Sequence, residues 1–161
     1  MFALLCLMAF AGACSRQTSQ PQSQKETKPV QAQRAGQNFA IKVVSVERVK
    51  EWQAPEGGSV RLTKGMSMKM INGSVSGFEA EPGYDIAVVR LSVNRMSEGA
   101  SLAVDDVSVY DEKDKKYSSL VGQLPALGRE KSERPEFGFA VPVGTALKKI
   151  ELAKEASVDL K

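Results

Sequence analysis

Hydrophobic and polar residues alternate along most of the chain beyond residue 38. From 39 to 43 every second residue is hydrophobic, and from 44 to 49 the alternation resumes after a shift of one position. An alternation of period two predicts a strand with one buried face, and a shift of one residue predicts a β-bulge within it. We therefore expect one long, bulged strand over 39–49.

The same pattern recurs in short segments separated by turn residues, and no helical period competes with it. Segment 84–94 is the longest and most hydrophobic, with β-branched residues on both faces at its start, which predicts a central strand covered on both sides. About 7 to 9 strands spaced in this way predict an all-β fold, an antiparallel β-sandwich. The other strands of the sandwich are expected at 59–63, 102–110, 117–120, 136–141, 147–152 and 158–160, and the segments 66–71 and 74–79 are expected to form an inserted hairpin.

The inward positions of these strands define the expected hydrophobic core. Both cysteines of the chain precede residue 15, so the sandwich has no disulfide and must be held together by packing. The single tryptophan, Trp52, is expected to close one end of the core. The predicted core residues are Ile41, Val43, Val88, Leu91, Val107, Val109, Phe139, Val141 and Ile150.

Residues 65–71 read GMSMKMI and are followed by Asn72-Gly73, the strongest short signal for a hairpin. Both central positions of a type I′ turn need positive φ, which Asn and Gly tolerate. If the turn joins strands 66–71 and 74–79, the methionines share one face, as a core requires, while Ile71 and Phe78 lie on the opposite, mostly polar face. The expected register pairs Met70 with Val75, Met68 with Gly77 and Met66 with Glu79.

Three thioethers on one strand face also allow a second interpretation, a Cu(I) site. Soft sulfur ligands suit that ion, whereas methionine is also a routine filler of irregular hydrophobic gaps. Packing is our primary interpretation, so we assign no metal and no other cofactor. The alternative is a periplasmic Cu(I)-binding protein that uses Met66, Met68 and Met70 as ligands.

The first residues of the chain differ in kind from the rest. A hydrophobic run over 2–10 is followed by small residues at 11–13 and then by Cys14. The run is too short to span a bilayer, and small residues after it are typical of a secretory signal peptide. Residues 11–14 resemble the lipobox of bacterial lipoproteins. The resemblance implies a cleaved leader over 1–13 and a diacylglyceryl group on the sulfur of Cys14, which anchors the chain in the membrane.

Residues 15–37 are rich in Gln and Ser and contain too little hydrophobic surface to offset the entropy of ordering. We therefore expect a lipidated cysteine and disordered tether over 14–37, with an r.m.s. span of roughly 25 Å, and a folded domain over 38–161. The tether carries four cations and one anion, which together account for the whole net charge of +3. The domain is thus neutral overall and offers no basic surface for nucleic acid.

Residues suited to catalysis are scarce. The chain contains no histidine and the domain contains no cysteine, which excludes histidine-dependent triads, histidine zinc sites and thiol nucleophiles. The acidic pairs Asp105-Asp106 and Asp111-Glu112 do not converge, because neighbours on a strand point to opposite faces. We interpret them as solvated turn charges and expect no enzymatic activity.

Three features of the second half of the chain occur together. They are a long hydrophobic strand that ends at Asn94, a charged hairpin over 111–117, and an aromatic strand that runs into Pro142. In these features residues 83–153 resemble an uncharacterised family of bacterial extracytoplasmic immunoglobulin-like domains, related in fold to a small secreted mycobacterial antigen and often tethered as lipoproteins. The resemblance implies an immunoglobulin-like sandwich in the cell envelope and assigns no activity.

The sequence therefore predicts a membrane-anchored binding or assembly module of the bacterial envelope. In a Gram-negative cell it would lie at the periplasmic face of the outer membrane, because Ser15 rather than Asp follows the lipidated cysteine. Its ligand cannot be read from the sequence, and we expect a protein partner. Long loops on a rigid scaffold often carry recognition, and segment 121–134 is the expected partner loop.

Overall fold

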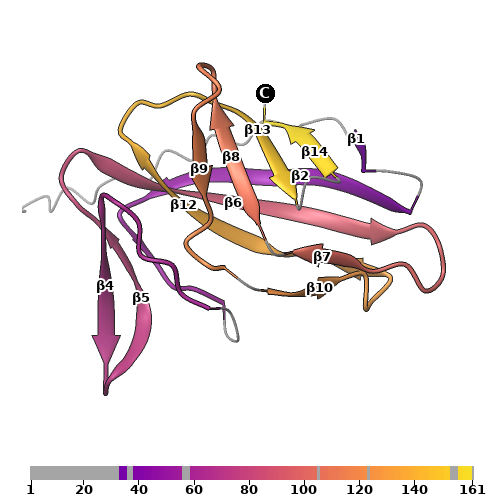
Figure 1. Cartoon of the computed structure of the whole chain (residues 1–161), viewed down its shortest axis with the longest axis horizontal. Coiled ribbons are helices and arrows are strands. Elements are labelled where there is room, and N and C mark those ends of the chain that lie inside the picture. Colours follow the sequence, from indigo (N-terminus) through magenta and orange to yellow (C-terminus); the bar gives the residue numbers. More distant parts are fainter. Residues whose placement is uncertain are drawn as a thin grey trace, which may run out of the picture.

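The computed structural model describes residues 33–35, 38–55, 59–104, 106–122, 124–152 and 156–160, and within these ranges all regular structure is strand. Every strand pairing is antiparallel, so the predicted fold class is confirmed (Figure 1). The strands are β1 (Gln33–Ala35), β2 (Phe39–Val49), β3 (Glu51–Trp52), β4 (Met66–Ile71), β5 (Ser74–Ala80), β6 (Tyr84–Arg95), β7 (Leu102–Val104), β8 (Val107–Asp111), β9 (Lys116–Ser118), β10 (Leu124–Leu127), β11 (Ser132–Glu133), β12 (Glu136–Pro142), β13 (Leu147–Leu152) and β14 (Ala156–Asp159).

The first sheet is built around β6. On one side β6 pairs with β2, which in turn pairs with β1, and on the other side it pairs with β12 and β11. The pairing of β2 with β6 shifts between Val43 and Ser45, and the extra residue, Val44, is exposed. This is the β-bulge that the interrupted alternation of 39–49 predicted.

The second sheet has the strand order β14-β13-β8-β9 and lies across the first sheet (Figure 1). Hydrophobic side chains from the two sheets meet between them, including Leu91 of β6, Val109 of β8 and Ile150 of β13. Each of the predicted core residues is at most 2% exposed, and all of them except Val88 lie in the core between these two sheets. Removal of this hydrophobic surface from water is the main force that holds the two sheets together.

A third sheet, with the order β3-β5-β4, packs on the outer face of the first. As a result the start of β6 is buried on both faces. Ala87 and Val89 point into the main core, whereas Ile86 and Val88 pack in a second cluster with side chains of the third sheet. The two-sided hydrophobic pattern of 84–94 predicted such a cover, but it did not predict which strands would supply it.

Several expected strands differ from the structure. Segment 59–63 is not a strand, since Val60 forms only an isolated bridge with Val121, and its hydrophobic residues are exposed. Segment 102–110 is divided into β7 and β8, which belong to different sheets. The structure also has more strands than the 7 to 9 expected, because several contain only two to four residues. Strands this short are too brief to produce a periodic pattern.

The N-terminal part of the fold begins earlier than expected. β1 pairs with β2, with Gln33 opposite Ile41, so strand structure starts inside the range predicted to be a tether. The predicted leader over 1–13, the lipid attachment at Cys14 and the tether up to residue 32 lie outside the described residues. In the part of the chain that is described, no helix is long and hydrophobic enough to cross a membrane.

A candidate interaction surface on the β4–β5 hairpin

β4 and β5 form a hairpin that extends away from the rest of the molecule (Figure 1). Its turn is Asn72-Gly73, with φ angles of 52° and 79°. Two consecutive residues with positive φ define a type I′ turn, whose twist matches that of the flanking strands. Few other residues adopt these angles without strain. The predicted hairpin and turn are therefore confirmed.

A β-bulge changes the register of the hairpin. The pairing shifts by one residue between Lys69 and Met70, and the extra residue is Ser76, whose hydroxyl donates to the Lys69 carbonyl oxygen at 2.9 Å. The shift brings Phe78 to the methionine side of the hairpin. Only the pair of Met70 with Val75 is as predicted; Met68 pairs with Phe78 instead of Gly77, and Met66 pairs with Ala80 instead of Glu79.

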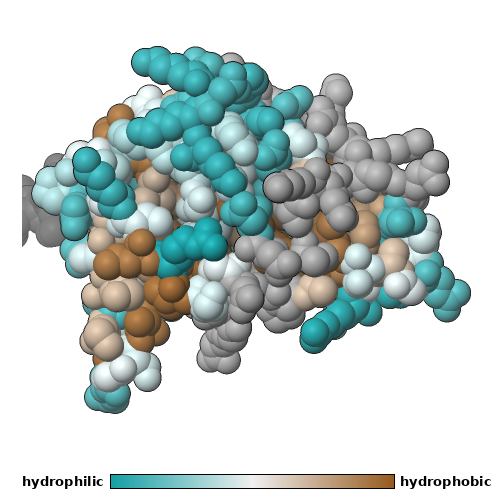
Figure 2. Space-filling model, in the orientation of Figure 1, coloured by the Kyte–Doolittle hydropathy of each residue, from teal (hydrophilic) through white to brown (hydrophobic). Residues whose placement is uncertain are grey.

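The three methionines share one face, but they are not all buried. Met66 is 4% exposed at the base of the hairpin, whereas Met68 is 40% exposed and Met70 is 57% exposed toward the tip. Ile71, beside the turn, is 58% exposed. Figure 2 shows hydrophobic side chains where β4 and β5 lie, at the lower left. The prediction that the methionine face is buried in the core is correct for Met66. It is wrong for Met68 and Met70, because the hydrophobic face of the hairpin continues from the core onto the surface.

Two aromatic residues attach the base of the hairpin to the first sheet. The rings of Trp52 and Phe78 stack with centroids 5.9 Å apart, and both side chains are buried. Trp52 Nε1 donates to Glu136 Oε1 at 2.6 Å, and Arg90 Nε donates to the other Glu136 oxygen at 2.5 Å. The indole ring lies over Gly138, where a Cβ atom would be 2.4 Å from it. Trp52 is therefore buried, but it packs in the second cluster on the outer face of the first sheet and does not close an end of the main core as predicted.

The opposite face of the hairpin carries charge. Lys69 Nζ lies 3.1 Å from Glu51 Oε2, and the lysine reaches across β5 at Gly77, which has no side chain. Glu51 pairs with Glu79 in the sheet, so this face presents two acids and one lysine. An open hollow of about 370 Å³ lies beside them, lined by residues that include Lys69, Ile71 and Glu51. The hairpin is thus hydrophobic on one side and mainly acidic on the other.

The outer edge of β4 is open. β4 is the last strand in the order β3-β5-β4, and among the described residues no backbone group pairs with its outer side. The carbonyl of Gly65 accepts from the N–H of Glu81 at 2.9 Å and the carbonyl of Lys69 accepts from Ser76, so both point toward β5. Backbone groups alternate in direction along a strand. The residues whose N–H and C=O therefore point outward are Met66, Met68 and Met70.

An open edge of this kind can pair with a further strand. Periodicity along the sequence does not reveal such an edge, because edge position depends on the order of strands in the sheet. Only one signal was available in the sequence. Ile71, next to the Asn-Gly turn, is an unusually hydrophobic residue for the tip of a hairpin.

Segment 121–134, which we expected to be a long partner loop, contains two short strands. β10 pairs with β7, and β11 pairs with β6. Leu127 is buried in the main core, and the chain turns at Gly128, which has a φ of 94°. The prediction of one long loop is wrong, because the backbone of β10 pairs with β7 and Leu127 packs in the main core.

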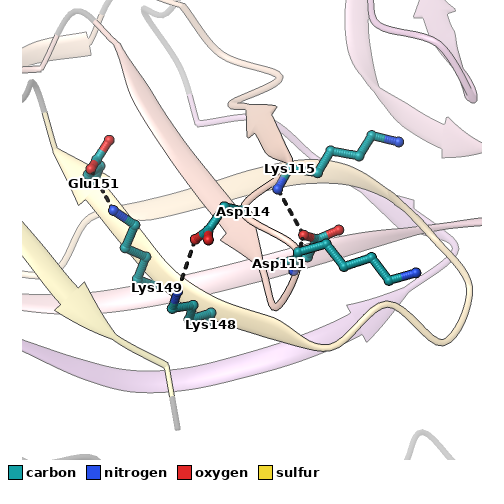
Figure 3. A network of polar contacts seen from close by, with 7 residues as sticks. Asp111, Asp114, Lys115, Lys148, Lys149 and Glu151 are labelled. Atoms are coloured by element: carbon teal, nitrogen blue, oxygen red, sulfur yellow. Dashed lines mark hydrogen bonds and ion pairs between the residues drawn. The ribbon is translucent and has the colours of Figure 1, made fainter.

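Asp111 stabilises the hairpin between β8 and β9 (Figure 3). Its Oδ1 accepts from the backbone N–H groups of Lys113 and Lys115, both at 2.9 Å, and its Oδ2 accepts from the Tyr117 hydroxyl at 3.1 Å. These hydrogen bonds, first that of Lys115, hold the pKa of Asp111 below its ordinary value. Asp111 is 8% exposed, so its interpretation as a solvated charge is wrong.

The other acidic residues form no metal cluster among the described residues. Asp106 forms an ion pair with Lys116 at 2.9 Å, and Asp105 lies outside the described residues. Within the described ranges no group of three or more His, Cys, Asp or Glu residues could hold a metal ion. The three methionines do share a face, but Met66 lies in the core and Met70 at the exposed tip.

No protein-family model matches the sequence, and no curated protein matches it. The structure is similar to the crystal structure of an uncharacterised β-sandwich protein from Clostridium difficile 630, with a TM-score of 0.48 and 10% identity. The match covers 89% of this chain and 98% of that one. At this score the similarity says nothing about ligand or activity.

Proposed function

We propose that this chain is a lipid-anchored protein of the bacterial cell envelope. Its β-sandwich serves as a non-catalytic binding or assembly module, and the β4–β5 hairpin contacts a protein partner. The observation that carries the proposal is the exposure of Met68 and Met70, at 40% and 57%, on a strand with an open edge. Burial of such side chains by a partner is favourable, and exposed hydrophobic patches commonly mark interaction sites.

The anchorage rests on the N-terminal sequence. The hydrophobic leader over 1–13 and the small residues before Cys14 support lipid attachment at that cysteine. The resemblance of 83–153 to immunoglobulin-like domains of bacterial lipoproteins, and to the related mycobacterial antigen, supports the same location. In a Gram-negative cell this is the periplasmic face of the outer membrane. A tether of roughly 25 Å r.m.s. span keeps the domain close to the membrane surface.

The hairpin suits binding because its base is firmly held while its tip is free. The stacked rings of Trp52 and Phe78 and the type I′ turn fix its shape before a partner arrives. A preformed surface loses less conformational entropy on binding than a flexible loop does. Methionine is also enriched at protein interfaces, and its flexible side chain adapts to different partner surfaces.

Photo-crosslinking in the native cell tests this proposal. A photoreactive amino acid replaces Met70 in one full-length variant and Val143 in the control variant, since Val143 is 58% exposed and lies after β12, outside the two strands of the hairpin. We expect a discrete protein product from position 70, its loss when Met68→Ser is added, and no such product from position 143. If position 70 gives no product, or both positions give the same products, the hairpin is not the binding surface.

The shared face of the methionines supports a second candidate, Cu(I) binding. Here Met66, Met68 and Met70 would supply soft thioether ligands. Titration of the protein with Cu(I) under reducing conditions decides between the two. Binding that weakens in the triple variant Met66→Leu, Met68→Leu and Met70→Leu would support the copper site, and unchanged binding would exclude it.

A further inference from the structure

We infer that a second copy of this chain binds at the open edge of β4, so that the two β4 strands pair antiparallel about Met68. The inference rests on the proposed function, because it names the partner of the same surface. The two three-stranded sheets would then form one continuous sheet with twofold symmetry.

The backbone geometry permits this pairing. Two edges join when the outward N–H and C=O groups of one strand meet those of the other. In β4 these groups belong to alternate residues, and Met68 is the middle one. Pairing about Met68 sets Met68 opposite itself, and Met66 opposite Met70 of the second copy. Every outward group of one strand then has a partner on the other.

The charges on the acidic face favour the same register. Pairing about Met68 places Lys69 opposite Ser67 of the second copy. Ser67 pairs with Glu79, and Glu79 pairs with Glu51, so the incoming lysine meets the acidic row of the other chain. Pairing about Lys69 would instead set two lysines directly opposite each other, which is destabilising. The surface is therefore complementary to itself in the register that also uses every outward group.

The hydrophobic face gains most from the same arrangement. Met70, which is 57% exposed, comes beside Met66 of the second copy at the base of that hairpin, and the two Met68 side chains meet at the centre. Each domain sits over the Met66 end of its own hairpin, where the second cluster is. Because the paired strands run in opposite directions, the two domains lie at opposite ends of the joint.

Sedimentation equilibrium of the full-length protein in detergent micelles, over a wide range of concentration, tests the inference. We expect the apparent protein mass to rise to that of two chains, and to remain that of one chain in Met68→Pro. The Met68 N–H points outward, so proline removes an edge donor and leaves the bonds to β5 in place. Met68→Leu is the matched control and should still dimerise. Circular dichroism must show that Met68→Pro is folded.

The register has its own test. Ser67 and Lys69 of the second copy would form a non-hydrogen-bonded pair, with Cα atoms roughly 4.5 Å apart, a distance that a disulfide can span. Differently tagged Ser67→Cys and Lys69→Cys chains are mixed and mildly oxidised. We expect more mixed disulfide than in the same experiment with Val143→Cys, which carries the same native cysteines.

These outcomes separate the inference from the proposed function. A chain that stays monomeric at all concentrations, or a dimer that survives in Met68→Pro and gives no mixed disulfide, overturns the inference. If such a chain still crosslinks from position 70 to another protein, the proposed function stands with a different partner. If it neither dimerises nor crosslinks, both fail. Cu(I)-dependent association that is absent from metal-free protein also overturns the inference.

Discussion

Asp111 shows how a single side chain replaces several backbone partners in a tight hairpin. Its carboxylate accepts two backbone N–H groups of the turn and the Tyr117 hydroxyl. A charged acceptor forms stronger hydrogen bonds than a neutral one. The folded state therefore favours the charged form, and the pKa of Asp111 falls below its ordinary value of 3.8. Its stabilising contribution is present above that pH and is lost as the pH falls through the lowered pKa.

Replacing Asp111 with asparagine tests this account. Asp111→Asn should lower the melting temperature at neutral pH, because a neutral amide oxygen accepts the same hydrogen bonds more weakly. The difference from wild type should shrink as the pH falls below the ordinary carboxylate range, where the wild-type carboxylate gains its proton. Thermal unfolding followed by circular dichroism at several pH values measures it.

Asp114 provides the matched control in the same hairpin. It is exposed, pairs with Lys148 at 2.9 Å, and has a φ of 58°, which asparagine accepts readily. Asp114→Asn should change the free energy of unfolding by about 0.5 kcal/mol or less. A pH-independent loss in Asp111→Asn, or an equal loss in Asp114→Asn, would contradict the role of the Asp111 charge.

Single strands and turns were predicted correctly where their structure depends only on neighbouring residues in the sequence. Alternation predicted β2 with its bulge at Val44, and Asn72-Gly73 predicted the hairpin turn. The second bulge, at Ser76, was not predicted, because it depends on Phe78 turning inward to stack on Trp52. That contact joins residues far apart in the sequence, so periodicity within the hairpin could not reveal it.

The turn of the β4–β5 hairpin is expected to require a left-handed backbone at Gly73. A Cβ atom at Gly73 would meet nothing within 4 Å, so the cost of Gly73→Ala comes only from the backbone angle. A left-handed conformation costs an L-residue roughly 1–2 kcal/mol. We expect a loss of about that size in the free energy of unfolding, measured by urea denaturation at constant m-value.

Asn72→Gly is the control, because glycine also accepts the positive φ at position 72. It should destabilise the protein less than Gly73→Ala does. Equal stability of Gly73→Ala and wild type would mean that the turn does not require positive φ at this position.

At the scale of the whole molecule, the sequence predicted a two-layer sandwich and the structure adds a third layer at one end. All predicted core residues are buried, yet Val88 faces the second cluster and not the main core. Because β6 is hydrophobic on both faces at its start, further strands had to cover its outer face. β3, one of these strands, has only two residues, and in β4 only Met66 is buried, so neither strand has a clear periodic pattern. The interaction surface could not be predicted for the same reason, because an open edge depends on the order of strands in a sheet and produces no periodic pattern in the sequence.

The proposed lipid anchor at Cys14 is tested on the full-length protein. In the native cell, Cys14→Ser should move the protein from the membrane fraction to the soluble fraction and abolish incorporation of labelled fatty acid. A lipid chain contributes about 0.8 kcal/mol per buried methylene group to membrane binding. Cys6→Ser, within the predicted leader, is the matched control and should leave both properties unchanged. Membrane association that persists in Cys14→Ser, or an unmodified Cys14 in the native protein, would contradict lipid attachment.

The proposed interaction requires that β4 has an open edge and that a partner strand then pairs with it. Residue-resolved amide hydrogen exchange along β4 measures this directly, in dilute protein and under conditions of association. We predict rapid exchange at Met66, Met68 and Met70 and slow exchange at Ser67, Lys69 and Ile71 in the free protein, with the methionine amides becoming protected on association. Protection of all these amides in the free protein, or methionine amides that still exchange rapidly after association, would contradict the account.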